Sequence, residues 1–96
     1  MSYTLVITDE AAADLLALVE SLPTAHRADA IDAVDVALTR LSDNPLPKAG
    51  DYFGRPAHEF SVPAGGITRR WGAAYRISSD EAHLVITHIF KVRHIL

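Results

Sequence analysis

The chain has 96 residues, of which 49% are apolar and 22% charged, with no cysteine and a net charge of −3. This composition is typical of one globular domain, residues 1–96, and it excludes disorder, disulfides and thiolate metal sites. No apolar run reaches the roughly 20 residues that cross a bilayer, so we expect a soluble, cytoplasmic protein with no membrane partner.

The net charge hides an asymmetry between the two halves of the chain. Residues 1–47 hold two basic residues against eight acidic ones, whereas residues 48–96 hold seven basic residues against four acidic ones. Five of the nine Lys/Arg residues and three of the five histidines lie within residues 69–94. This pattern predicts a polarised surface that favours an anionic partner at one side.

The first half of the chain predicts a strand followed by two helices. Residues 3–8 form a β-rich run, and Thr8 or Asp9 can cap the helix that follows. Its apolar stripe ends before Pro23; the stripe consists of Ala11, Leu15, Leu18, Val19 and Leu22. A second helix is predicted from Thr24 to Ser42, with Ile31, Val34, Leu38 and Leu41 on the apolar side and Asp29, Asp32 and Asp35 on a solvated side.

The second half predicts a loop and three strands. Residues 43–57 hold three prolines and two glycines, which indicates a long, functional loop. Strands are predicted at 58–62, 67–77 and 83–92, with turns at 63–66 and 78–81. The fold class is therefore α+β: an N-terminal strand, an antiparallel helical hairpin, then three antiparallel strands forming one sheet with the helices on one face.

The hairpin of the last two strands has one favourable register. With Ile77 opposite Leu84, the apolar residues share one face; the pairs are Tyr75 with Ile86, Ala73 with His88, and Trp71 with Phe90. The other face then carries the cations Arg70, Arg76, Lys91 and Arg93, and the small residues Gly72 and Ala74 lie between them. A slip by one residue would mix charge with core. We interpret this face as a polyanion site; a solvated sheet face is the alternative.

For several single residues, an ordinary structural role competes with a functional one. We expect Trp71 and Tyr75 to be core aromatics, with base-stacking platforms as the alternative, and His88 to be a satisfied core histidine, with a functional histidine as the alternative. Glu59 is predicted to form a surface salt bridge, with a general base as the alternative. No HxxxH or HxH spacing supports a metal site, and we expect no cofactor.

The ensemble of these features resembles the RelE/ParE superfamily of bacterial type II toxins. The resemblance covers nearly the whole chain and is carried by the element order, ITDEAAADLLAL, LSDNPLPKAG, the YRI–turn–LVITHIF hairpin and the closing KVRH. It implies a cytoplasmic toxin that is neutralised by a cognate antitoxin. RelE-like members cleave mRNA on the ribosome, and ParE-like members inhibit DNA gyrase. A homodimer or a toxin–antitoxin hetero-oligomer is expected.

RelE-like cleavage would place several residues in named roles. Arg93 matches the position of a commonly catalytic arginine, with Arg70 and His94 as further catalytic candidates. Residues that would hold phosphates are Arg69, Arg76, Lys91, Lys48 and Arg55.

The chain also departs from the RelE-like pattern. The arginine usual near position 72 is Gly72, and the terminal tyrosine is absent, so Arg69 or Arg70 and His94 would have to replace them. These departures favour a gyrase inhibitor or a non-catalytic binding module, whereas Arg93, His94 and the clustered cations favour an RNase. The first expectation is growth arrest by ribosome-dependent mRNA cleavage through the basic sheet face, and the other two functions are its alternatives. An antitoxin is expected to bind the cationic face or the groove of the helical hairpin.

Overall fold

The computed structural model describes residues 3–43, 51–52, 55–64, 66–80 and 82–92. Its elements follow the predicted order, with one additional short strand and one 3-10 turn: β1 (Thr4–Ile7), α1 (Asp9–Glu20), η1 (Thr24–His26), α2 (Arg27–Asp43), β2 (Asp51–Tyr52), β3 (Arg55–Ala64), β4 (Ile67–Ile77) and β5 (His83–Lys91). The predicted α+β fold is confirmed. In the predicted loop at 43–57, residues 44–50 and 53–54 lie outside the described residues, and the described part belongs mainly to β2 and β3.

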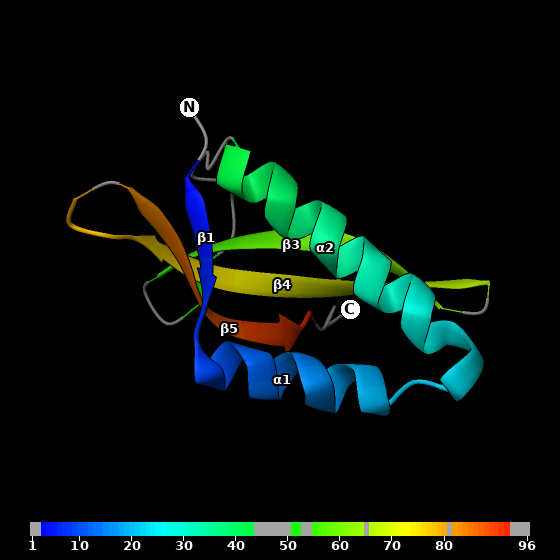
Figure 1. Cartoon of the computed structure of the whole chain (residues 1–96). Helices are drawn as coiled ribbons and strands as arrows, with labels where there is room; N and C mark the ends of the chain where they lie inside the picture. Colours follow the sequence, from blue (N-terminus) through cyan, green and yellow to red (C-terminus); the bar gives the residue numbers. More distant parts are fainter. Residues whose placement is uncertain (1–2, 44–50, 53–54, 65, 81, 93–96) are drawn as a thin grey trace.

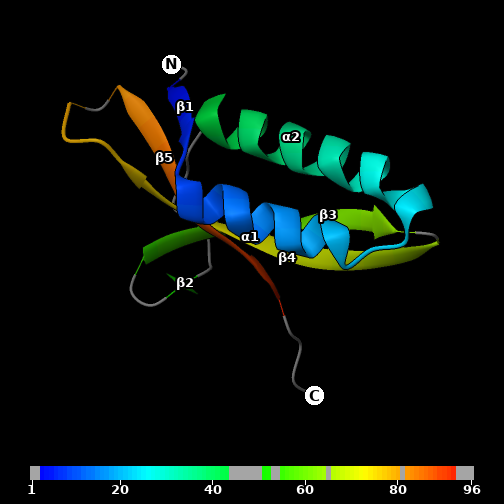
Figure 2. The same ribbon diagram turned by 60° about the horizontal axis from the view of Figure 1, so that its bottom comes forward.

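The five strands form one sheet in the order β1-β5-β4-β3-β2. β5 pairs in parallel with β1 and antiparallel with β4, so it is a central strand over Leu84–Ile86. α1 packs against β5 and α2 against β3, and both helices lie on the same side of the sheet (Figure 1). β2, the last strand in this order, lies away from the helices, beyond the level of the other strands (Figure 2).

The N-terminus of α1 is fastened to the sheet by Thr8. Its hydroxyl accepts the N–H of Ala11 at 3.2 Å, which confirms the predicted cap, and donates to the carbonyl of Ile86 at 3.0 Å. Asp14, nearly two turns along the same helix, accepts the backbone N–H of Ile89 at 3.2 Å. α1 therefore satisfies β5 backbone groups at and beyond Ile86, where the pairing with β1 ends.

The helices bury most of their predicted stripes. α2 packs Val34, Leu38 and Leu41 into the core, and α1 contributes Ala11 and Val19. Asp29, Asp32 and Asp35 are exposed, as predicted. The prediction for Ile31 was wrong, because its side chain is 48% exposed.

The β4–β5 register differs from the predicted one beyond a β-bulge. Ile77 lies opposite Leu84 and Tyr75 opposite Ile86, as predicted, but Ala74 then lies opposite His88. Thr87 is the extra residue, and its hydroxyl donates to the carbonyl of Ala74 at 3.2 Å. Every β5 residue after Thr87 therefore has the opposite facing from the one predicted.

The turn between β4 and β5 is closed by Asp80. Its carboxylate accepts the hydroxyl of Ser78 and the backbone N–H of Ala82. These hydrogen bonds, the Ser78 one first, hold the pKa of Asp80 below its ordinary value. This turn sets the register in which the hairpin begins.

No helix in the described part of the chain is long and apolar enough to span a membrane.

Candidate functional site

The predicted cationic face does not gather the cations expected of it. Arg70 and Arg76 lie on the sheet face away from the helices, six residues apart on β4, which is about 20 Å. Lys91 lies opposite Trp71, because the bulge reverses its facing. Arg69 alternates with Arg70 and points to the helix side, where its Nε is buried without a hydrogen-bond partner among the described residues.

Arg70 is paired with an acid of the neighbouring strand. Its guanidinium donates to Oε1 of Glu59 at 3.3 Å, and both side chains are partly exposed. This is the surface salt bridge predicted for Glu59. Such exposed pairs contribute only about 0.2–1 kcal/mol to stability, but the pair neutralises the local positive charge.

The space expected beside Gly72 is filled. Gly72 lies opposite Phe90, and a Cβ added at Gly72 would come within 2.5 Å of the Phe90 ring. The face predicted to be open is also buried near its centre, at Ala57, Ala74 and Val85. The prediction that small residues leave room for a ligand here was wrong.

His88 was also misplaced by the predicted register. It lies opposite Ala74, half-buried, with its Nδ1 3.5 Å from Oδ2 of Asp14 on α1. The same carboxylate oxygen accepts the N–H of Ile89, so His88 stands beside the carboxylate that joins α1 to β5. It is not a core histidine.

The predicted core aromatics are confirmed. Trp71 is 1% exposed and Tyr75 is buried on the same face, and burial raises the pKa of the Tyr75 hydroxyl above its ordinary value. The indole Nε1 of Trp71 has no hydrogen-bond partner among the described residues. Neither ring is available to stack on a base.

Four predicted site residues lie outside the described side chains. Lys48, Arg93 and His94 belong to undescribed segments, and Arg55 is described only through its backbone in β3. Among the described residues, no group of acids and histidines is arranged to hold a metal ion.

An apolar groove lies between the two helices. It has a volume of about 290 Å³ and is lined by Ile7, Ala12, Leu15, Leu16, Val19 and Ile31. Leu16 is 60% exposed. We call this surface the helix groove. Its exposed apolar side chains make the helix groove a candidate site for a macromolecular partner.

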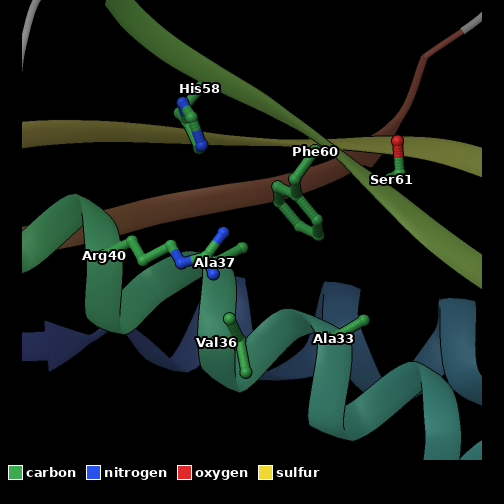
Figure 3. A pocket seen from close by; sticks show the side chains of 7 residues that line it. All are labelled: Ala33, Val36, Ala37, Arg40, His58, Phe60 and Ser61. Atoms are coloured by element: carbon green, nitrogen blue, oxygen red, sulfur yellow. The ribbon is translucent and has the colours of Figure 1, made fainter.

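A second cavity lies between α2 and β3 (Figure 3). It has a volume of about 380 Å³ and is lined by Ala33, Val36, Ala37, Arg40, His58, Phe60 and Ser61. The rings of His58 and Phe60 stack with centroids 6.3 Å apart. We call this surface the α2–β3 groove. Sequence reasoning missed it, because Arg40 and His58 carry no motif that relates them.

The sequence matches the profile of the family described as ParE toxin of type II toxin-antitoxin system, parDE, over residues 5–95. The chain belongs to this family. It is a type II toxin of the RelE/ParE superfamily, as the resemblance predicted. Among curated proteins no relative was detected.

Solved structures of RelE-type proteins share the fold. The RelBE2 toxin–antitoxin complex of Mycobacterium tuberculosis aligns with a TM-score of 0.55 and 26% identity, covering 96% of this chain and 100% of that one. A mutant E. coli toxin RelE in the free state gives 0.56 and 15%, covering 95% of this chain and 84% of that one. The intact E. coli RelBE complex gives 0.56 and 15%, covering 97% and 100%. The two E. coli likenesses show the fold alone.

In this ParE-family toxin, Gly72 and Phe90 should be energetically coupled. Gly72→Ala is expected to lower the free energy of unfolding by about 1–3 kcal/mol, because the Phe90 ring must move to admit a methyl group. In a Phe90→Ala background the same change should cost much less. Urea unfolding of the four proteins of this double-mutant cycle measures the coupling. Additive effects would contradict the contact.

Proposed function

We propose that this toxin arrests growth by binding DNA gyrase, without nuclease chemistry of its own. RNA cleavage through attack of a 2′-hydroxyl requires cations that converge on one phosphate and a side chain that moves protons. The described cations are divided between the two sheet faces instead: Arg70 and Arg76 lie on the face away from the helices, whereas Arg69 and Lys91 have the facing of Trp71.

The observation that carries the proposal is the contact between Phe90 and Gly72. RelE-like enzymes usually have an arginine near this position, as the sequence resemblance implies. Here the position has no side chain, and an apolar ring occupies the space that such a side chain would need. The nearest described cation on this face, Arg70, is already paired with Glu59. Both features favour the ParE-like activity.

Ribosome-dependent mRNA cleavage is the second candidate. Arg70 and Arg76 do share a sheet face, and Arg93 and His94 follow β5 in the sequence. In this alternative Arg93 stabilises the charge that develops on the phosphate, and His94 transfers a proton.

We also propose a cognate antitoxin as the cytoplasmic partner. The RelBE2 and RelBE structures are toxin–antitoxin complexes, which supports such a partner for this chain. The helix groove offers the apolar surface that an amphipathic helix of an antitoxin needs. α1 and α2 belong to the acidic first half of the chain, so acidic residues surround the helix groove. Basic residues flanking the apolar stripe of the antitoxin helix would therefore assist binding.

Two assays on the purified toxin separate the candidate activities. We expect inhibition of gyrase supercoiling and no toxin-dependent cleavage when mRNA from a translation reaction is mapped by primer extension. Cleavage without any effect on supercoiling would contradict gyrase binding. The variant Arg93→Ala then serves as the control, because it should abolish cleavage while its thermal melting stays that of the parent.

A further inference from the structure

Among the described residues, the outer edge of β3 has no strand neighbour over most of its length. β2 pairs with β3 only at Arg55 and Pro56, and β4 pairs with its other side from Ala57 to Ala64. Within the described ranges, residues 57–64 therefore have a strand neighbour on one side only. Unpaired edge strands present backbone N–H and C=O groups that can pair with another extended chain.

Two prolines define which part of this edge can pair. Pro56 and Pro63 flank the segment 57–62, and neither has an N–H to donate. The backbone N–H and C=O groups of successive residues point alternately to the two edges of a strand. Pro63 has no N–H to donate to β4, so we place Pro63 and every second residue before it among those whose backbone groups point to the outer edge. In this phase Glu59 and Ser61 direct their backbone groups outward, while His58, Phe60 and Val62 pair with β4. Ala57 has the same phase but is 2% exposed, so its edge is already covered.

The α2–β3 groove borders this same edge. His58 and Phe60 face it from the strand, and Val36, which is 49% exposed, faces it from the helix (Figure 3). Ala33 and Ala37 are small, so the helix wall leaves space for side chains that enter from outside. A strand added to β3 would place alternate side chains in this space.

Arg40 supplies charge at one end of the groove. Its side chain is exposed, and it has no ion pair within the described part of the chain. In Figure 3 Arg40 and His58 lie at one end, whereas Ala33 and Ser61 lie at the other. Because α2 and β3 run in opposite directions here, a strand antiparallel to β3 reaches Arg40 after it has passed Ala33.

We propose that the α2–β3 groove binds an extended peptide segment of a partner protein, which pairs antiparallel with residues 58–62 of β3. Its recognition pattern is an apolar side chain beside Val36, followed two residues later by an acidic side chain at Arg40. The strand edge supplies affinity through backbone hydrogen bonds, and the groove supplies specificity. This binding is separate from the proposed gyrase activity and from the helix groove.

The groove chemistry fits a peptide better than the other occupants. Nucleic acids need several cations to neutralise consecutive phosphates, whereas Arg40 is the one Lys or Arg among the residues that line this groove. A second copy of the chain would present His58, Phe60 and Val62 on the helix side of an added β3 strand. That set contains no acid to meet Arg40.

Nuclear magnetic resonance on the 15N-labelled full chain tests the proposal. The probe is the peptide acetyl-Thr-Leu-Thr-Glu-Thr-amide, and its matched control has Gln in place of Glu. Binding should raise the protection of the Glu59 and Ser61 amides from hydrogen exchange more than that of the His58 and Phe60 amides. The Gln peptide should bind about 10-fold more weakly, which is the range for a lost hydrogen bond to a charged group.

Variants of the protein identify the contacts. Arg40→Gln should remove the preference for the Glu peptide, and Arg40→Lys should restore part of it. Ser61→Pro removes an outward N–H and should abolish binding. A probe peptide that is N-methylated at alternate amides should fail in the same way, so the result does not depend on how well Ser61→Pro folds.

Several outcomes would overturn the proposal. These are no binding of the probe at millimolar concentration, amide protection confined to the helix groove, and an unchanged Glu preference in Arg40→Gln. A concentration-dependent dimer that protects the same β3 amides without any probe would assign the edge to a second copy instead. Gyrase inhibition should be the same in Arg40→Gln as in the parent, so failure here leaves the proposed function untouched.

Discussion

Leu84→Ala is expected to lower the free energy of unfolding by about 2–5 kcal/mol, because it leaves a cavity in the centre of the sheet. The Leu84 side chain is 0% exposed, and its strand lies between β1 and β4. It faces Leu5 on one neighbour and Ile77 on the other. Small domains have a total stability of about 5–15 kcal/mol, so this one change removes a large share of it. Urea unfolding followed by circular dichroism measures the loss.

A matched truncation at the surface controls for the chemical change. Leu16→Ala removes the same atoms from a side chain that is 60% exposed, so it should change stability by less than about 0.5 kcal/mol. Growth arrest should fall in Leu84→Ala in proportion to the folded protein that remains. Equal stability of the two variants would contradict the central position of Leu84.

The sequence was sufficient to predict the fold because several local patterns agreed. The stripes of the two helices, the cap at Thr8 and the first half of the β4–β5 hairpin are all consequences of apolar periodicity. Each of these requires only residues that are near in sequence. The extra strand β2 was not predicted, since a two-residue strand lies below what periodicity can indicate.

The bulge at Thr87 explains most of what was wrong in the predicted site. A strict alternation places Phe90 in the core and Lys91 beside Arg70, whereas the structure reverses both. The sequence did contain a signal: the β5 residues in the core under the helices are Leu84, Ile86 and Ile89, so their spacing changes from two to three. If Ile89 had been taken as the third core residue of this strand, its spacing from Ile86 would have indicated the bulge at Thr87.

The pairing of charges on the sheet face away from the helices could not be predicted for a different reason. Whether Arg70 is free depends on the β3–β4 register, which places Glu59 opposite Gly72 and next to Arg70. That register is fixed across a turn and not by the pattern of either strand alone. A cluster of cations in sequence therefore indicates only the charge available, and pairing decides how much remains exposed to a ligand.

The helix groove is therefore better suited than the sheet face to bind a partner. The sheet face is partly neutralised by Glu59 and covered by Phe90, whereas the helix groove keeps Leu16 and Ile31 exposed. Exposed apolar surface of this kind is costly in a free protein and is removed when a partner binds. The groove is thus the surface on which we expect neutralisation by the antitoxin to depend.

Leu16→Glu is expected to weaken binding of the cognate antitoxin by at least about 100-fold. The substitution puts a carboxylate in the apolar wall that also contains Val19 and Ile31, and an antitoxin helix would have to desolvate that charge. Folding should be unaffected, because Leu16 is mostly exposed in the free toxin. Titration calorimetry on the purified pair gives the affinity, and growth during co-expression reports neutralisation in cells.

Ala17→Glu is the control for added charge on the same helix. Ala17 is exposed and does not line the groove, so the variant should bind antitoxin like the parent. Without antitoxin, Leu16→Glu should still arrest growth, since the substitution leaves the core intact. With antitoxin, it should arrest growth where the parent and Ala17→Glu do not. If Leu16→Glu is instead neutralised as fully as the parent, the antitoxin binds elsewhere and the helix groove is not its site.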